Sequence, residues 1–364
     1  MTSAYEILAQ LKRTASGPMT EARGAEPAFY WNEEVASAEE NAIFRHDWVC
    51  PGLASEIPDV GDYLTFSIAG EPVFSIRDSS GEINTYANIC RHRMMQLLQG
   101  RGRTSRVTCP YHAWSYNLQG QLVGAGHMNH SAGFDKTKIC LPQIRTEIWN
   151  GWIYITLNPD AQSMKKALAP LNDVVARYGM EHYVGVLNEE HVWQTNWKLL
   201  TENFMEGYHL PVAHKATVGA WFAPNKTVFP DQSYDSFTYQ TFAKTHAARY
   251  GQAHPDNTRL TGEWRNTSIL PTVFPTHMYV LAPDHLWYLS LRPRGVGAVD
   301  VRFGVAIAPE VDAMLTDTAE RAAWIRDLVA FFEHVNGRIE CGRRHLCRFT
   351  VVVCLARTTE LARA

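Results

Sequence analysis

Short apolar runs separated by turn residues follow one another through the first half of the chain. We interpret residues 1–40 as a helical arm. The runs beyond it are rich in β-branched and aromatic residues and are bounded by Gly, Asp and Ser, which is typical of strands. They lie at 63–68, 72–76, 81–86 and 151–157. The pattern predicts an all-β domain over residues 41–158.

The second half mixes helical and strand-like patterns. In residues 316–335, apolar side chains recur every three or four positions, as in an amphipathic helix. Residues 225–262 are polar and rich in turn residues, which would suit a mobile loop or lid. Further helices are expected at 164–179 and from about 196, with strands near 184–194, 278–291 and 299–308. We therefore predict a second, mixed α+β domain over residues 159–336.

Two short loops each combine a cysteine with a histidine: Cys90 and His92, then Cys109 and His112. This is the ligand set of a Rieske [2Fe–2S] cluster, in which two His replace two Cys on one iron. A zinc site uses the same ligand types, but zinc fingers usually keep like ligands together. Buried Cys and His without any ligand are the remaining alternative. The mixed loops, and the Trp-Ser-Tyr at 114–116 that can surround a cluster, favour iron.

A second candidate metal site lies in the second domain. Glu202, Glu206 and His209 are spaced i, i+4 and i+7, which predicts one helical face. Pro211 is expected to end the helix near His209, so that His214 can join it. Two His and one carboxylate form the facial triad of non-haem Fe(II) oxygenases. The alternative is a buried amphipathic helix with incidental histidines.

From about residue 40 to about 335, the chain resembles the large (alpha) subunit of Rieske non-haem iron oxygenases, a superfamily of aromatic-ring-hydroxylating dioxygenases and choline-monooxygenase-like enzymes. The loops starting at Cys90 and Cys109 match C-x-H-R and C-P-Y-H-x-W-x-Y, although Met94 stands where the family usually has glycine. The stretch from Asn196 to His214 matches N-W-K-x-x-x-E-N-F-x-E-x-Y-H-x₄-H.

The resemblance implies site residues. His209 and His214 would hold a mononuclear Fe(II). Glu206 would be the bridging acid that links an iron-ligand His to a cluster-ligand His of a neighbouring subunit. Asn203 would lie beside the site. The residue after His209 is Leu210, where quaternary-amine members tend to carry Cys.

The resemblance also implies the fold, the reaction and the partners. An antiparallel sheet with helices, of the helix-grip type, is expected for the catalytic domain. The protein would be a terminal oxygenase that uses O₂ to hydroxylate or demethylate a small organic substrate. Electrons would come from a separate NAD(P)H-dependent reductase or ferredoxin. A homotrimer is expected, with or without a small beta subunit, and the Glu bridge and chain length lean towards the monooxygenase-like branch.

The C-terminal region departs from the family. The third iron ligand, an Asp, is expected in a pattern like N-x-E-D, but residues 336–339 read Asn-Gly-Arg-Ile, and Glu340 is the nearest acid. Read one nucleotide later, the codons for 341–350 and 356–362 permit family-like strings. We hypothesise that residues 337–364 are an aberrant tail produced by a frameshift. An electron carrier or inactive homologue without functional mononuclear iron is therefore the alternative function.

Composition adds limits. The 364 residues include 34 Lys+Arg and 37 Asp+Glu, a formal net charge of −3 without long single-sign blocks, so nothing indicates nucleic-acid or membrane binding. The seven cysteines show no disulfide framework, which favours a cytoplasmic protein. Residues 1–40 lack an apolar core, so no signal peptide is expected, and no stretch of about 18 apolar residues predicts a membrane span.

Overall fold

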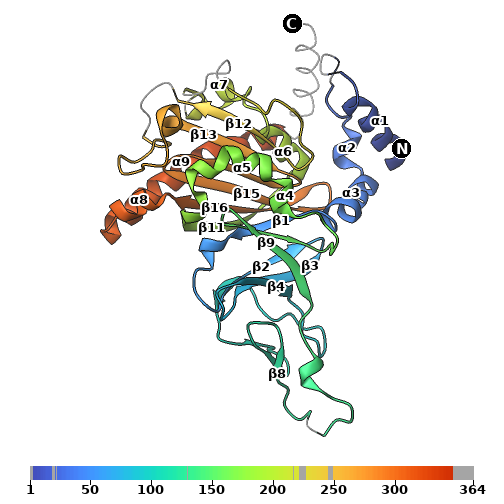
Figure 1. The fold of residues 1–364 in the computed structure, drawn as a ribbon. Coiled ribbons are helices and arrows are strands. Elements are labelled where there is room, and N and C mark those ends of the chain that lie inside the picture. The colour runs from blue at the N-terminus through green and yellow to red at the C-terminus, as the bar shows by residue number, and fades with distance from the viewer. Residues whose placement is uncertain are drawn as a thin grey trace. The chain divides into compact units, whose positions relative to one another are not determined.

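The chain forms two compact units in a computed structural model, which describes residues 3–18, 21, 23–128, 130–215, 217–220, 227–244 and 249–346 (Figure 1). One unit is Asn41–Gly185. The other combines Met1–Glu40 with Val186–Ala364. The sequence placed the first boundary at residue 158, whereas the structure extends that unit to Gly185.

The extension follows from packing within the unit. The Oγ of Ser163 donates to a carboxylate oxygen of Glu147 at 2.8 Å, which ties the segment to strand β9 (Gln143–Trp149). Leu168, Leu171 and Val175 are fully buried. The helix expected at 164–179 is broken into α4 (Met164–Ala167), α5 (Ala169–Val175) and the 3₁₀ turn η5 (Ala176–Tyr178). Pro170 begins a new helix because it has no N–H to continue the old one.

Antiparallel strands dominate the Asn41–Gly185 unit. One sheet has the order β1-β10-β9-β4-β3-β2-β5, and a small sheet has the order β6-β7-β8. Between β3 and β4, the paired Ser75 and Thr85 share a buried hydroxyl hydrogen bond of 2.8 Å. The remaining elements are η2 (Glu40–Phe44), β1 (Val49–Leu53), η3 (Ala54–Glu56), β2 (Asp62–Ile68), β3 (Glu71–Arg77), β4 (Ile83–Ala87), β5 (Arg101–Arg103), β6 (Val107–Thr108), β7 (Ser115–Tyr116), β8 (Leu122–Gly124), η4 (Lys136–Lys138), β10 (Trp152–Thr156) and η6 (Met180–His182).

The second unit is built on one antiparallel sheet of order β11-β16-β15-β14-β13-β12. Its strands are β11 (Val184–Trp193), β12 (Phe237–Ala243), β13 (Thr267–Val273), β14 (His277–Leu281), β15 (His285–Arg294) and β16 (Ala298–Ile307). Its helices and turns are α1 (Ala4–Ala15), α2 (Ala28–Trp31), α3 (Glu33–Glu39), α6 (Trp197–Phe204), α7 (Leu210–Ala213), η7 (Val218–Ala220), η9 (Gly262–Asn266), α8 (Pro309–Met314) and α9 (Thr318–Leu346).

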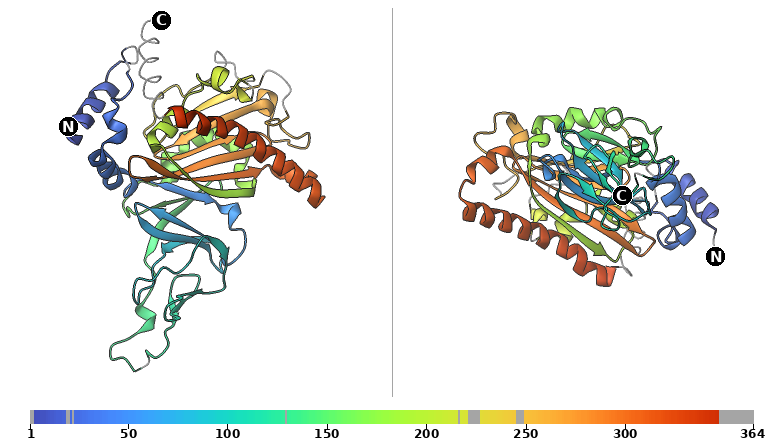
Figure 2. Two further views of the ribbon diagram at one scale, coloured as in Figure 1. Left: turned by 180° about the vertical axis from the view of Figure 1, so that it is seen from behind. Right: turned by 90° about the horizontal axis from the view of Figure 1, so that it is seen from below.

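Helix α9 covers one face of this sheet (Figure 2). Phe332 is buried, and its ring centroid lies 5.5 Å from that of Trp287 on β15. The helix continues to Leu346, well past the predicted end at residue 335. The rest of the hypothesised tail, residues 347–364, lies outside the described residues.

The predicted lid at 225–262 is wrong in its middle, because residues 237–243 form the edge strand β12. All seven residues of β12 pair with β13, and Phe237 and Gln240 are buried. The amide of Gln240 also donates to the Phe204 carbonyl at 3.0 Å, which joins the sheet to α6.

Buried polar contacts hold α6 against the N-terminal helices. Lys198 Nζ lies 2.6 and 2.9 Å from the two carboxylate oxygens of Glu39 at the end of α3. The indole N–H of Trp197 donates to the same carboxylate at 3.1 Å. The helical arm predicted at 1–40 is therefore part of the framework that positions α6.

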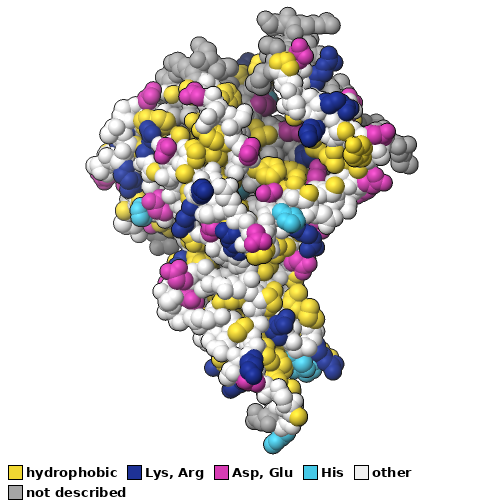
Figure 3. Space-filling view, turned by 45° about the vertical axis from the view of Figure 1, so that its right-hand side comes forward, with side chains coloured by type: hydrophobic (Ala, Val, Ile, Leu, Met, Phe, Trp, Pro, Cys, Tyr) yellow, Lys and Arg dark blue, Asp and Glu magenta, His cyan; other side chains and the backbone are white. Residues whose placement is uncertain are grey.

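Surface charge is mixed. On the face shown in Figure 3, Lys and Arg side chains are interspersed with Asp and Glu. Within the described ranges, none of the helices has the length and hydropathy that a membrane span requires.

Candidate metal centres

The two Cys-His loops of the first unit have the same backbone design. The N–H of Cys90 donates to Met95 O, and the N–H of Met94 returns to Cys90 O. The second loop repeats both bonds, from Cys109 to Trp114 O and from Ala113 to Cys109 O. Met94 and Ala113 occupy the left-handed region, with φ of 58° and 55°. This explains why the family usually has glycine at the position of Met94.

The four predicted cluster ligands fall into two pairs. Cys90 and Cys109 are buried in one apolar cluster, with 0% and 3% of their surface exposed. His92 and His112 are exposed, and their ring centroids lie 4.6 Å apart. Two buried sulfurs and two adjacent imidazoles suit a [2Fe–2S] cluster in which one iron takes Cys and the other takes His.

Aromatic residues after the second loop support these ligands. The backbone N–H of Arg91 donates to the Tyr116 hydroxyl oxygen at 3.0 Å, and that oxygen lies 3.3 Å from Cys90 Sγ. A thiolate can only accept, so the Tyr116 proton points to sulfur when Cys90 is a ligand. Burial raises the pKa of Tyr116, which keeps that proton in place. The ring of His92 stacks on Trp114 at 4.8 Å.

The predicted single helical face for Glu202, Glu206 and His209 is wrong, because α6 ends at Phe204. The carboxylate of Glu206 accepts from the backbone N–H groups of Tyr208 at 2.5 Å and His209 at 3.2 Å. This side-chain capture replaces the helical ladder. Glu202 instead accepts a hydrogen bond from the Tyr30 hydroxyl, whose oxygen lies 2.8 and 3.0 Å from the two carboxylate oxygens. Burial raises the pKa of Glu202.

His209 and His214 flank the short helix α7, as its N-cap and C-cap residues. Their ring centroids are 5.2 Å apart. Pro211 therefore starts this new helix and does not end the old one, as its position in the first turn allows. A carboxylate oxygen of Glu206 bonds to His209 Nδ1. The structure thus brings these three predicted residues together.

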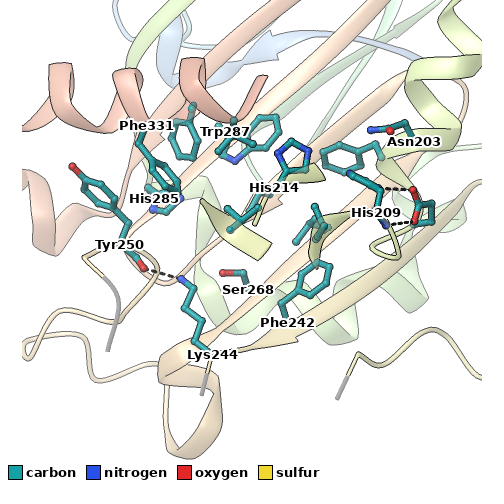
Figure 4. A pocket seen from close by; sticks show the side chains of 18 residues that line it. Asn203, His209, His214, Phe242, Lys244, Tyr250, Ser268, His285, Trp287 and Phe331 are labelled. Atoms are coloured by element: carbon teal, nitrogen blue, oxygen red, sulfur yellow. Dashed lines mark hydrogen bonds and ion pairs between the residues drawn. The ribbon is translucent and has the colours of Figure 1, made fainter. Parts of the chain in front are cut away.

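A cavity of about 140 Å³ adjoins the histidines within the second unit (Figure 4). The polar side chains in its wall include the predicted Asn203, Glu206, His209 and His214. The wall is otherwise mostly apolar. It comprises Phe204, Leu210, Val218, Phe242, Lys244, Tyr250, Ser268, Leu270, Val280, His285, Trp287, Phe331, Phe332 and Val335.

The sequence did not indicate the polar residues at the far side of this cavity. Lys244, Ser268 and His285 come from β12, β13 and β15 or their ends, and no local spacing links them. Burial lowers the pKa of Lys244 to about 8, against the opposing effect of Asp284. Burial acts to raise the pKa of Asp284, but His285, Lys244 and the Gly251 N–H together hold it below its usual value.

No described acid completes a three-ligand metal site at the histidines; nor do three or more His, Cys, Asp or Glu converge on one ion elsewhere among the described residues. Val335 of α9 lines the cavity, and the Asp of the expected pattern N-x-E-D would fall four residues later, at position 339. Ile339 occupies that position. Glu340, the nearest acid, is the next residue in the sequence.

Two protein families match the chain. The Rieske [2Fe-2S] domain matches residues 47–141, and the ring hydroxylating alpha subunit (catalytic domain) matches residues 180–337. The chain therefore combines a Rieske [2Fe-2S] domain with the catalytic domain of a ring-hydroxylating alpha subunit. This confirms the predicted family, the α+β fold class and the two cofactor classes, a [2Fe–2S] cluster and a mononuclear iron.

Characterised relatives share part of the sequence. The chain is 33% identical over 218 residues to the glycine betaine monooxygenase oxygenase subunit of Chromohalobacter salexigens, covering 58% of this chain and 49% of that protein. It is 33% identical over 189 residues to the carnitine monooxygenase oxygenase subunit of Escherichia coli, covering 51% and 50%. The chain thus spans about half the length of the curated relatives it matches.

Solved structures share the fold. The quaternary ammonium Rieske monooxygenase CntA superimposes with a TM-score of 0.73 at 21% identity, over 88% of this chain and 84% of that one. Naphthalene 1,2-dioxygenase from Rhodococcus sp., bound to indole, gives a TM-score of 0.68 at 25% identity, over 83% and 76%.

Proposed function

We propose that the protein is the terminal component of an oxygenase system that hydroxylates or demethylates a small organic substrate with O₂. The observation that carries this proposal is the meeting of His209, His214 and Glu206 at one largely apolar cavity. The same chain carries the paired loops at Cys90 and Cys109. Electron storage and an O₂ site would thus be provided by one polypeptide.

The ligand residues have distinct tasks. Cys90, His92, Cys109 and His112 would hold the Rieske cluster, and His209 and His214 the mononuclear iron. When bound, the cluster supplies single electrons and the iron supplies O₂ activation. The exposure of His92 and His112 keeps that side of the cluster accessible to a redox partner.

Glu206 positions His209. Its carboxylate accepts a hydrogen bond from Nδ1–H, which leaves Nε2 as the nitrogen available to a metal. About 46% of the Glu206 side-chain surface is exposed, so the carboxylate can also accept a hydrogen bond from another chain. We propose that it meets a cluster-ligand His of a neighbouring subunit. Asn203 is proposed to orient ligands at the cavity wall.

The proposed assembly follows from these roles. A homotrimer, with or without a small beta subunit, would bring the cluster of one chain to the Glu206 of the next. A separate NAD(P)H-dependent reductase or ferredoxin would deliver electrons, and the protein would work in the cytoplasm. The likeness to CntA and naphthalene dioxygenase supports the alpha-subunit fold and carries no argument for the assembly or the partners.

The missing third ligand supports one alternative, an electron carrier or inactive homologue. In the pattern N-x-E-D that the resemblance implies, the Asp falls at position 339, where this chain has Ile. The family matches favour the oxygenase, because both domains are present.

Iron and acid-labile sulfide, measured per chain on anaerobically purified protein, test the proposal. About three irons to two sulfides are expected, since the cluster holds two irons and the histidines one. His209→Ala should lose one iron and keep both sulfides. The control His182→Ala, at an exposed histidine of the first unit, should keep all of its iron and sulfide. Two irons to two sulfides in the parent, with no reductant-dependent O₂ uptake, would favour the electron carrier.

A further inference from the structure

One charged side chain lies in the cavity away from the candidate iron ligands. Lys244 follows β12 directly and lines the cavity beside Ser268. In Figure 4, Lys244 and Tyr250 lie on one side of the view and His209 on the other. The cavity therefore has two chemically different sides, with aromatic rings between them.

The position of Lys244 is fixed by neighbouring groups. Its Nζ donates to the carbonyl of Tyr250 at 2.8 Å. Asp284 holds the next residue of the same turn, because its carboxylate accepts from the Gly251 N–H at 2.7 and 2.8 Å. The same carboxylate lies 2.7 Å from His285 Nδ1.

Gly251 shows how closely the ammonium fits. Its φ is 80°, and a Cβ at this position would lie 1.4 Å from Lys244 Nζ. Glycine therefore serves two purposes here: it adopts the left-handed conformation, and it leaves room for the lysine. The burial that lowers the Lys244 pKa to about 8 still leaves most of the side chain protonated at neutral pH.

Resting on the proposed function, we infer that Lys244, with Ser268, binds the carboxylate of the substrate, and that the substrate is a small aromatic or apolar carboxylic acid. An ammonium and a hydroxyl are suitable donors to a carboxylate. Phe242, Trp287 and Phe331 provide flat apolar surface for the body of the molecule. A cavity near 150 Å³ accommodates a benzene-sized body.

The charge distribution argues against a purely cationic substrate. Lys244 repels a like charge in a cavity of low polarity, where charge interactions are stronger than in water. Among the described residues of the cavity wall, Glu206 is the one carboxylate, and it already bonds to His209.

Titration calorimetry on the purified full-length holoprotein tests the inference with three probes. Benzoate is the carboxylate, benzamide is its neutral isostere, and choline is a quaternary ammonium without a carboxylate. We expect benzoate to bind about tenfold or more tightly than benzamide, since the carboxylate makes charge-assisted bonds. Lys244→Met should abolish this difference by weakening benzoate alone. Lys244→Arg should keep much of it, and Lys166→Met, at an exposed lysine, should keep all of it.

Four results would overturn the inference: no benzoate binding, equal affinities for benzoate and benzamide, equal weakening of both by Lys244→Met, or tighter binding of choline. If Lys244→Met does not fold, Ser268→Ala and Lys244→Arg carry the same comparison. Iron is measured in each sample. Selective benzoate binding without a third iron would contradict the proposed function but not this inference. Choline-stimulated O₂ uptake without benzoate binding would contradict this inference but not the proposed function.

Discussion

Breaking the buried ion pair between Glu39 and Lys198 should destabilise the unit that contains the cavity. Their side chains are 8% and 6% exposed, and Nζ lies 2.6 and 2.9 Å from the carboxylate oxygens. Removing one partner from such a pair leaves a buried charge, which typically costs about 3–5 kcal/mol. We therefore expect Glu39→Leu and Lys198→Met each to lower the free energy of unfolding by about that amount.

The double variant should be less damaged than either single variant. With both charges gone, the main loss is the hydrogen bond from Trp197 to Glu39, at 3.1 Å. A lost hydrogen bond of this kind costs about 1–2 kcal/mol. Replacement of a whole buried pair by apolar groups is often close to neutral.

Urea unfolding followed by tryptophan fluorescence measures these differences. Lys166→Met, at an exposed lysine, is the matched control and should be within about 0.5 kcal/mol of the parent. The reasoning is refuted if each single variant loses less than about 1 kcal/mol, or if the double variant loses the sum of the two. Benzamide affinity should fall with stability, because α6 carries Asn203 and Phe204 to the cavity wall.

Three further predictions concern the site. Glu206→Gln should reduce substrate-stimulated O₂ uptake about 10–100-fold, because the carboxamide no longer fixes His209. Dithionite should still bleach the cluster of this variant. Uptake equal to that of the parent protein would contradict the prediction. Benzoate affinity should be constant below neutrality and fall as the pH rises through about 8, since Lys244 then loses its proton. Calorimetry of Lys244→Arg should show no such fall. A parent protein whose benzoate affinity does not change with pH would contradict the role of Lys244. Ile339→Asp should raise iron affinity about tenfold, measured by chelator competition, with Ile339→Asn as control. No change in affinity would mean that α9 does not present position 339 to the iron.

Local patterns were sufficient to find the loops that carry the candidate ligands. Cys90 and His92 are separated by one residue, and His209 and His214 by four, so short-range backbone structure decides where they lie. The left-handed conformation of Met94 explains why the family usually has glycine at this position, although the residue here is methionine.

The far side of the cavity could not be predicted in the same way. Lys244, Ser268 and His285 are brought together by strand pairing between segments that carry no shared motif. The end of α6 was also not predicted. Glu206 stands at a helical spacing from Glu202 whether it continues the helix or, as observed, accepts hydrogen bonds from backbone N–H groups beyond the helix end. The strand β12 escaped notice because polar, turn-rich segments surround it.

The short helix α7 determines how a metal at this site would be linked to folding. Four residues, Leu210–Ala213, separate His209 from His214 in the sequence. A metal that binds both histidines therefore closes a short loop and restricts little conformational freedom. Two such ligands would rigidify one turn. A third ligand on α9 would instead cross-link segments more than a hundred residues apart, and metal affinity would then report on the stability of the whole unit. In this chain, chelation and unfolding should be nearly independent, whereas a restored carboxylate at position 339 should couple them.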